Sequence, residues 1–494
     1  MRRPLRIVLL LIASLALLLV VPAKTLREPA LEPGRSATPS GAVQISDRSE
    51  VRHCRADGRM RGVNYPNTEV EPYGAVNPRD PSNIVATWQQ DRWSNGGART
   101  MPVARSTDGG ATWDLVEAPD GPRITLCSSG TKANKADYQR ASDPWLSFAP
   151  NGDLYQTSLS FNQKNAASAV LVSKSTDGGA TWSDPVVIRS DPTAFNDKES
   201  ITADPRTPPD GRRSAAYVVW TRDGKAWFSK TTDGISWRKA RPILKEGFSV
   251  AHQIEVHRSG RLIDVFSLFK SKGRNYIAVM HSKDAGASPG DRWSRPILIS
   301  KFSFVPARDP DTGQKLRSGE ALPDIATDQK TGALYVAWQD LVFKANGKRY
   351  SGIFFSMSRD GGERWSKPVR INQPSAALAD PNDQAFIPAL HVASDGTVGV
   401  SYYDFRQNTD AESVSTDYWL ARCTGRSQPC TDRQSWSEEH VAGPFDMEMA
   451  PTSSHGLFLG DYMTTTGAGR DFALFFVQST VFTGNRTNVY FRQM

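Results

Sequence analysis

The eight residues Ser106-Thr107-Asp108-Gly109-Gly110-Ala111-Thr112-Trp113 decide the fold, because the chain repeats them. Ser175–Trp182 is an identical copy, Ser358–Trp365 is a related one, and Thr231–Trp237 is shortened. Two weaker copies end at Trp293 and Trp436, so successive tryptophans are 69, 55, 56, 72 and 71 residues apart. A period of this size indicates an array of similar structural units.

Each unit has the pattern of four short strands. The unit that contains Ser358–Trp365 shows them in order as Leu322–Ala326, Leu334–Trp338, Ile353–Met357 and Trp365–Val369. Apolar residues alternate with polar ones and are rich in β-branched and aromatic types, which favours strands over helices. The Asp-Gly-Gly segment supplies the positive φ values that a tight hairpin turn needs.

Four-stranded units repeated in this way predict an all-β fold, a β-propeller of four-stranded blades. Seven opening strands favour seven blades, and six blades plus an irregular closing sheet is the alternative. The last unit lacks a fourth strand, so we expect the segment Ala42–Ile45 to supply it and close the ring. Residues 42–494 then form a single domain. The opening strands contain Glu71-Pro72, Asp143-Pro144, Lys198-Glu199-Ser200, His252-Gln253, Pro323-Asp324, Phe386-Ile387-Pro388 and Gly460-Asp461-Tyr462.

The N-terminus has the layout of a secretory signal. Arg2, Arg3 and Arg6 precede the apolar run Ile7–Val21, and small residues follow it. We therefore expect a cleaved signal peptide over 1–23, with an uncleaved anchor as the alternative, and a disordered leader over 24–41. The mature protein is then exported to the periplasm or the extracellular space, without stable membrane insertion, and we expect a monomer.

Net charge indicates which partners to expect, and the cysteine content indicates disulfides. The formal charge of +8 falls to +5 without residues 1–23, and the remaining basic residues are scattered, which argues against nucleic-acid binding. Four cysteines in an exported chain predict two disulfides. Cys423 and Cys430 can close a local loop, which leaves Cys54 to pair with Cys127 by elimination.

The repeated Ser/Thr-x-Asp-x-Gly-x-Thr-Trp motif resembles the Asp box of sialidases and other BNR-repeat propellers. The chain is similar above all to secreted bacterial sialidase-like proteins, in the segments Asn67–Pro72, Trp88–Trp93 and Gly399–Arg406. The resemblance implies a glycoside hydrolase of the exo-α-sialidase class acting on glycans, including acidic ones. In that family the Asp box is a structural turn away from the active site.

Sialidase catalysis requires arginines that bind the sugar carboxylate and a tyrosine nucleophile with a partner acid. It also requires an acid that protonates the leaving group. The first arginine normally stands in a Phe/Tyr-Arg-Ile-Pro motif, which this sequence does not contain. Its nearest string, Ala385–Pro388, has no arginine. A non-catalytic propeller that binds glycan or protein is therefore the alternative, and a polysaccharide lyase is a third, less favoured one.

Polar residues at the starts of opening strands and at the ends of second strands should meet at the ring centre. We expect the catalytic residues among Tyr403, Asp404, Asp461 and Glu199. Further opening-strand acids are Glu69, Glu71, Asp143 and Asp324. The expected substrate-binding residues are Arg92, Asp91, Arg222, Arg406, Asp340, Tyr462 and Trp93.

The motifs for metals and cofactors are weak. Asp309-Pro310-Asp311-Thr312-Gly313 resembles part of a calcium loop but lacks the distal glutamate, so a surface turn is favoured and a structural calcium ion is the alternative. His252-Gln253-Ile254-Glu255-Val256-His257 is not a zinc-protease motif, because only alternate residues of a strand share a face. We expect no catalytic metal and no organic cofactor.

Overall fold

The computed structural model describes residues 41–494, apart from 59–60, 245–246, 283–291, 344–347, 375–379, 410–412, 426–428 and 468. The expected signal peptide (1–23) and leader (24–41) lie outside the described residues, except for Gly41. Among the described residues, helix is limited to short 3₁₀ turns, and none is long and apolar enough to span a bilayer. These turns are η2 (Glu50–His53), η3 (Leu126–Ser128), η4 (Ser271–Gly273), η5 (Asp380–Asn382), η6 (Arg433–Ser435) and η7 (Met447–Met449).

The strands form antiparallel sheets in chain order. The first contains β2 (Glu69–Val76), β3 (Ile84–Arg92), β5 (Val103–Ser106) and β6 (Asp114–Val116), and β4 (Ala98–Thr100) joins β3 to the next sheet. That sheet contains β7 (Arg140–Phe148), β8 (Leu154–Phe161), β9 (Ser168–Ser175) and β10 (Val186–Asp191). Then follow β11 (Asn196–Ala203), β12 (Ala216–Arg222), β13 (Lys225–Thr231) and β14 (Arg241–Pro242).

The second half of the chain repeats the pattern. One sheet contains β15 (Phe248–Val256), β16 (Leu262–Lys270), β17 (Arg274–Ser282) and β18 (Ile297–Phe302). The next contains β20 (Asp324–Thr327), β21 (Leu334–Phe343), β22 (Arg349–Ser358) and β23 (Val369–Arg370). Another contains β24 (Ala385–Val392), β25 (Val398–Asp404), β26 (Ser415–Cys423) and β27 (Ser437–Asp446).

The last sheet joins the two ends of the described chain. It contains β30 (Thr464–Thr466), β31 (Ala473–Phe482), β32 (Asn485–Gln493) and β1 (Val43–Gln44). Strand β1 pairs antiparallel with β32, with Val43 opposite Phe491, as the sequence predicted. A small three-stranded sheet of β19 (Leu316–Arg317), β28 (Thr452–Ser453) and β29 (Gly456–Phe458) links two of the connecting loops.

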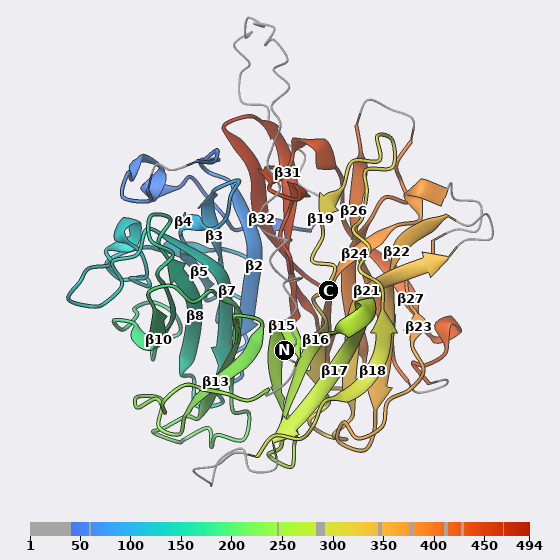
Figure 1. The fold of residues 1–494 in the computed structure, drawn as a ribbon, viewed down its shortest axis with the longest axis horizontal. Coiled ribbons are helices and arrows are strands. Elements are labelled where there is room, and N and C mark those ends of the chain that lie inside the picture. The colour runs from blue at the N-terminus through green and yellow to red at the C-terminus, as the bar shows by residue number, and fades with distance from the viewer. Residues whose placement is uncertain are drawn as a thin grey trace, which may run out of the picture. The chain divides into compact units, whose positions relative to one another are not determined.

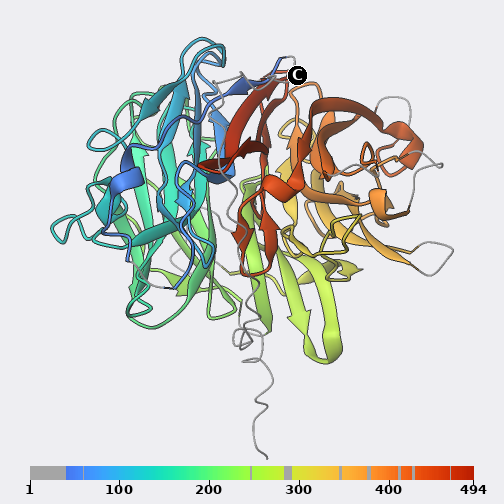
Figure 2. The ribbon, with the colours of Figure 1, turned by 90° about the horizontal axis from the view of Figure 1, so that it is seen from above.

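The first strands of the sheets form a ring. Each contacts the next in the order β2, β7, β11, β15, β20, β24 and β30, and β30 contacts β2. Figures 1 and 2 agree on this arrangement: the blue and cyan sheets lie on one side, the yellow and orange sheets on the other, and the red strands between them. Four-stranded sheets around a common centre are the architecture of a β-propeller.

The repeated motif forms the turn after the third strand of a sheet. In the second copy, Ser175 Oγ donates to Asp177 Oδ1 at 2.7 Å, Thr181 N–H donates to the same oxygen at 2.9 Å, and Trp182 Nε1 donates to the Gly179 carbonyl at 3.1 Å. The first copy has the same bonds, and the hydrogen bond from Thr112 lowers the pKa of Asp108 to about 2. Third and first strands run in the same direction, so these turns lie at the opposite end of the sheets from the starts of the first strands.

A β-bulge recurs near the start of the first strands. The pairing with the second strand shifts register after Val70, Ser142, Asp197, Val250 and Phe386. The residues in the bulges adopt left-handed φ values of 54° to 60°, which is rare for residues with a side chain: Glu71, Asp143, Lys198, Ala251 and Ile387. Since a bulge redirects a side chain, Glu71, Asp143 and Lys198 are turned together at one end of the ring.

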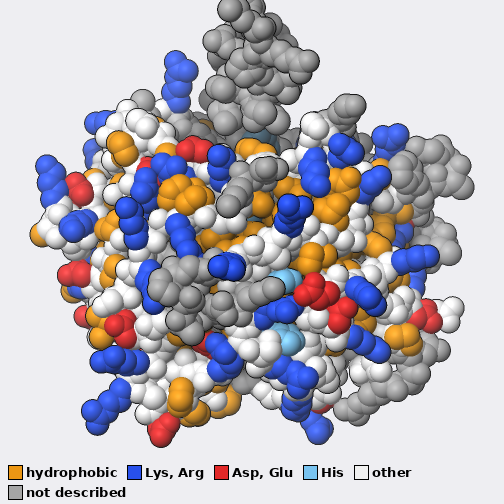
Figure 3. Space-filling view, turned by 60° about the horizontal axis from the view of Figure 1, so that its bottom comes forward, with side chains coloured by type: hydrophobic (Ala, Val, Ile, Leu, Met, Phe, Trp, Pro, Cys, Tyr) orange, Lys and Arg blue, Asp and Glu red, His pale blue; other side chains and the backbone are white. Residues whose placement is uncertain are grey.

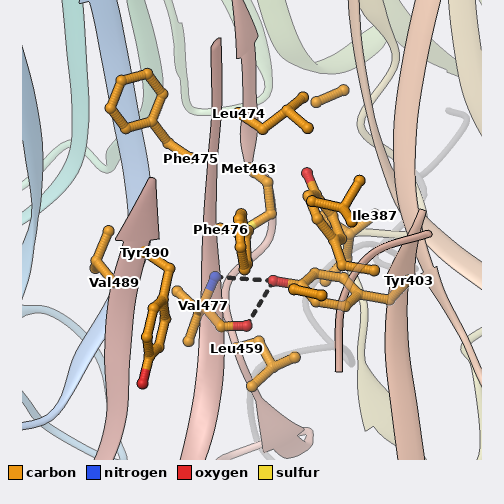
Figure 4. Packing of buried hydrophobic residues seen from close by; sticks show 14 of the residues in the cluster. Ile387, Tyr403, Leu459, Met463, Leu474, Phe475, Phe476, Val477, Val489 and Tyr490 are labelled. Carbon is orange, nitrogen blue, oxygen red and sulfur yellow. Dashed lines mark hydrogen bonds between the residues drawn. The ribbon is translucent and has the colours of Figure 1, made fainter. Parts of the chain in front are cut away.

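The apolar faces of neighbouring sheets form the core between them. Figure 4 shows one such cluster, in which Tyr403 from β25 lies against Val477 of β31. Both disulfides expected from the sequence are present: Cys54–Cys127 and Cys423–Cys430. Figure 3 shows Lys and Arg side chains spread over the face that it presents rather than gathered in one patch.

Candidate active site

A cluster of charged residues lies where the first strands begin. Asp461, in the loop before β30, accepts a hydrogen bond from Lys198 Nζ at 2.7 Å. The same ammonium group contacts Asp143 Oδ1 at 3.1 Å. Asp143 lies on β7, Lys198 on β11 and Asp461 in the loop before β30, so Lys198 ties the last part of the chain to β7 and β11. Its side chain retains 13% exposure, so solvent reaches it.

Arg317 completes the ionic contacts of Asp461. Its Nε donates to Asp461 Oδ1 at 2.8 Å, and Nη2 donates to Oδ2. Such a two-point contact matches a planar guanidinium to a carboxylate. The guanidinium stacks over the Phe458 ring at 4.5 Å, and Arg92 lies over the same ring at 4.9 Å.

Buried polar groups support the loop that carries Asp461. The Asp461 N–H donates to Glu71 Oε1 at 3.0 Å, and Gln89 donates to the other oxygen of Glu71. Arg92 in turn donates to Gln89. Gly319 packs against this loop with a φ of +62°, and a Cβ there would lie 2.0 Å from the Asp461 carbonyl oxygen. Only glycine therefore allows the approach that brings Arg317 to Asp461.

The carboxyl groups of the cluster differ in pKa and fall into two kinds. Although burial raises the pKa of Asp461, the charges of Arg317 and Lys198 hold it well below its usual range. Burial raises the pKa of Asp197 to about 7 and that of Glu320 to about 7. Burial raises the pKa of Glu71 to about 7 as well, against the opposing charge of Lys198. An ionised carboxylate therefore lies among carboxyl groups that hold a proton near neutral pH.

Glu199 differs from the other acids of the cluster. Neither of its buried carboxylate oxygens has a hydrogen-bond partner in the described part of the chain. Burial raises its pKa well above the usual value, and the charge of Asp143 adds to the effect. Burial therefore favours the protonated form of Glu199, since an isolated buried charge is costly.

A cavity of about 500 Å³ reaches the cluster along the ring centre. Asp461 and Tyr462 line it, together with residues of the first strands β2, β7, β11, β15, β20, β24 and β30. The rings of Tyr73 and Trp145 stack at 4.0 Å, and Tyr462 lies 5.4 Å from Trp145. The Tyr462 hydroxyl donates to the Pro144 carbonyl at 3.1 Å, which fixes its ring in the wall.

Four of the expected site residues belong to the charged cluster or to the cavity wall: Arg92, Glu199, Asp461 and Tyr462. Burial lowers the pKa of Arg92 to about 10, and the charges of Asp461 and Asp143 oppose this effect. Asp461 is the central member, because Lys198 and Arg317 both contact it.

Tyr403 lies elsewhere, although the sequence favoured it as a catalytic residue. Its side chain is fully buried in the apolar core, its hydroxyl donates to the Val477 carbonyl at 2.8 Å, and the Val477 N–H donates back at 2.9 Å (Figure 4). Burial raises its pKa well above the usual value. Because Tyr403 lies in the apolar core and, among the described residues, contacts neither the charged cluster nor the cavity, we exclude it from the candidate site.

Asp404 and Arg406 form a separate buried network. Arg406 Nε contacts Asp404, and Arg406 Nη1 contacts Glu438 at 2.6 Å. Tyr402 donates to Glu438 as well, and Trp419 lies 4.0 Å from the guanidinium. These contacts join β25, β26 and β27 within one sheet, so the network supports that sheet and does not line the cavity.

The remaining expected residues also have structural partners. Arg222 contacts Asp191 through Nε and Nη2, both at 2.8 Å, and so links the β7–β10 sheet to the β11–β14 sheet. Asp340 accepts the Ser303 N–H at 2.9 Å. Asp91 accepts from Ser49 and from the Asn67 N–H, and Trp93 donates to Asp57 at 3.0 Å. None of these four residues lines the cavity among the described residues.

Sequence reasoning missed Lys198, Arg317 and Asp197 as site residues. Lys198 and Asp197 adjoin Glu199 in an opening strand, and the bulge that turns Lys198 inward has no signature in the sequence. Arg317 lies in a long connection before β20, 144 residues from its partner Asp461. Only the folded chain brings these two residues together.

The segment considered for calcium forms a turn. Asp309 accepts the N–H groups of Asp311 and Thr312 at 2.8 and 3.0 Å, and Asp311 accepts from Asn408 at 3.2 Å. Within the described residues, no group of three or more His, Cys, Asp or Glu side chains could hold a metal ion.

No protein-family model matches the sequence, and no curated protein matches it. Solved structures that resemble the chain include an α-L-arabinofuranosidase from Fusarium graminearum, with a TM-score of 0.47 and 10% identity over 93% of this chain and 98% of that one. An α-L-arabinanase from Penicillium chrysogenum has a TM-score of 0.42 and 13% identity over 92% and 98%. A sialidase from Trypanosoma rangeli has a TM-score of 0.42 and 14% identity over 92% and 60%.

Proposed function

We propose that the chain is a glycoside hydrolase whose active site is the charged cluster around Asp461. The observation that carries the proposal is the pairing of an ionised carboxylate, Asp461, which Arg317 and Lys198 contact, with a half-buried acid beside Lys198 on β11, Asp197, whose pKa burial raises to about 7. Hydrolysis of a glycosidic bond needs one carboxyl group of each kind, and the surroundings of a site set them apart.

Asp197 is the proposed proton donor. Its carboxyl group forms no ion pair among the described residues, and burial keeps it protonated to about pH 7. A protonated carboxyl group can deliver its proton to the leaving oxygen of the substrate. Asp461 is the proposed carboxylate that stabilises positive charge on the sugar ring, or attacks it. Glu71 is a positioning residue, because it holds the Asp461 main chain.

The contacts of the two arginines favour a neutral sugar. Both guanidinium groups already have partners: Arg317 contacts Asp461, and Arg92 contacts Gln89. A sialic acid carboxylate would have to displace these contacts. Sialidase activity is therefore the narrower alternative within the same class.

A non-catalytic glycan-binding propeller is the second candidate function. The observation in its favour is that each cation of the cluster is already in a hydrogen bond or an ion pair, as in a purely structural network. In that case the aromatic rings of the cavity would provide the stacking surface for a sugar.

The test is the release of 4-methylumbelliferone from a panel of neutral pyranosides and furanosides and from an α-sialoside. The wild type should hydrolyse at least one neutral substrate, and Asp461→Asn should lose activity on all of them. Asp197→Asn should lose about 10²–10⁴-fold on natural oligosaccharides and much less on a dinitrophenyl glycoside, because a good leaving group needs no proton.

Asp210→Asn is the matched control, since Asp210 is exposed in a loop and should leave the rates unchanged. If both site variants kept wild-type rates, the assignment of Asp197 and Asp461 would be incorrect. If the wild type hydrolysed no glycoside but bound oligosaccharides, the second candidate would be supported instead.

The proposal also covers the number of blades, the location of the protein, its partner and its oligomeric state. We assign seven blades to the propeller, supported by the cyclic contacts of seven first strands. We propose export to the periplasm or extracellular space, since two disulfides are typical of oxidising compartments. Glycan is the proposed partner, and the working unit is a monomer.

A further inference from the structure

The described lining of the central cavity has more acidic than basic side chains. Three carboxyl groups line it, those of Glu255, Asp324 and Asp461, and no lysine or arginine is among its described lining residues. Asp461 has its cations in the cluster above. Glu255 and Asp324 form no ion pair with any described residue. The cavity therefore has uncompensated negative potential wherever these two groups are ionised.

Glu255 and Asp324 lie on neighbouring first strands, β15 and β20. Asp324 accepts the Leu390 N–H at 2.7 Å and the Ile325 N–H at 2.9 Å, which fixes its carboxylate. Burial raises the pKa of Glu255 to about 8, and the nearby charge of Asp324 contributes. Burial likewise raises the pKa of Asp324 to about 7. A bound cation would offset the cost of ionising both groups.

Aromatic rings form another part of the wall. Tyr73 and Trp145 stack at 4.0 Å with an interplanar angle of 28°, and Tyr462 contacts both rings. Glu255 and Asp324 act on the pKa of Tyr73, so its hydroxyl lies in the same region as the two acids. The faces of aromatic rings attract cations, and carboxylates anchor an ammonium group.

We propose that this cavity binds a small organic cation, an amine whose ammonium group contacts Glu255 and Asp324 and whose carbon skeleton packs on Tyr73 and Trp145. The volume of about 500 Å³ suits a small molecule. A divalent metal fits less well, because calcium takes six to eight oxygen ligands and the described residues include no cluster of three metal-binding side chains. The proposal goes beyond hydrolysis and does not require it.

Isothermal titration with cyclohexylammonium chloride tests the proposal on the whole protein. Cyclohexanol and cyclohexanecarboxylate are the matched probes, since they keep the ring but carry no charge or the opposite one. Cyclohexylammonium should bind at least about tenfold more tightly than cyclohexanol, and the carboxylate should not bind. Equal binding of the amine and the alcohol would overturn the proposal.

Glu255→Gln is the site variant, because the Glu255 side chain accepts no main-chain hydrogen bond from any residue that the structure describes. It should weaken binding of the amine at least about tenfold and leave cyclohexanol unaffected. Asp210→Asn, an exposed carboxylate outside the cavity, should bind the amine like the wild type. Unchanged binding in Glu255→Gln would overturn the proposal.

If Glu255→Gln failed to fold, the pH dependence of wild-type binding would decide. The titratable groups that face the cavity are Tyr73, Glu255, Asp324, His391, Asp461 and Tyr462. Burial lowers the pKa of His391 to about 4, so it stays neutral. Ionisation of Glu255 and Asp324 should tighten binding of the amine between pH 6 and pH 9. Affinity that is flat over this range, or displacement of the amine by calcium, would overturn the proposal.

Discussion

Lys198 holds the site together electrostatically, and its replacement by methionine tests this directly. The ammonium group lies 2.7 Å from Asp461 and 3.1 Å from Asp143, with 13% of the side chain exposed. Methionine keeps the length and apolar stem of the side chain but removes the charge. Removing one partner of a buried ion pair costs about 3–5 kcal/mol, and we expect Lys198→Met to lower the free energy of unfolding by this amount at pH 8.

The loss should depend on pH in a defined direction. In the wild type, Lys198 opposes the effect of burial on the pKa values of Glu71 and Asp197, which both lie at about 7. Without Lys198 these folded-state pKa values rise further above those of the unfolded chain. The folded variant then binds more protons than the unfolded chain, so its stability falls as pH rises from about 5 to about 8. The cost of the substitution is therefore smaller at pH 5.

Urea denaturation of wild type and variant at pH 5 and pH 8, followed by tryptophan fluorescence, measures both effects. Lys301→Met is the control, because Lys301 is exposed on β18 and should change the free energy by less than about 0.5 kcal/mol. A loss below about 1 kcal/mol for Lys198→Met, or an equal loss at the two pH values, would refute the electrostatic role of Lys198.

Four further outcomes are expected. Replacing both Cys54 and Cys127 with serine opens a 73-residue loop and should cost about 4 kcal/mol in chemical denaturation, and a cost near zero would contradict the loop-entropy argument. Tyr403→Phe should lose about 1–3 kcal/mol of stability and keep the hydrolytic rate, and a lost rate at full stability would restore Tyr403 to the site. Asp177→Ala should lower stability by about 1–2 kcal/mol through its turn hydrogen bonds, without a change in hydrolysis. Hydrolysis should decline above about pH 7, where Asp197 loses its proton, and a rate that rises through pH 8 would exclude Asp197 as the proton donor.

The repeats alone determined the type of fold. Each Asp-Gly-Gly turn satisfies its hydrogen bonds within eight residues, as Asp177 does with Ser175 and Thr181, so the signal is local and visible in the sequence. The alternation of apolar residues then predicts strands, and the number of repeats predicts a cyclic array. The N-terminal strand and both disulfides could also be predicted from the sequence, since an unpaired last unit and an even cysteine count leave few choices.

The composition of the site depended on contacts that the sequence does not display. Alternation shows that Tyr402 and Tyr403 point to opposite faces of β25, but only the packed neighbours show that both faces are buried. The left-handed bulge at Lys198 and the approach of Gly319 to Asp461 are backbone features set by packing between sheets. Arg317 reaches Asp461 because a small sheet of loop strands holds it there. Local turns are encoded within a few residues, whereas a cluster at the ring centre forms only when distant strands meet.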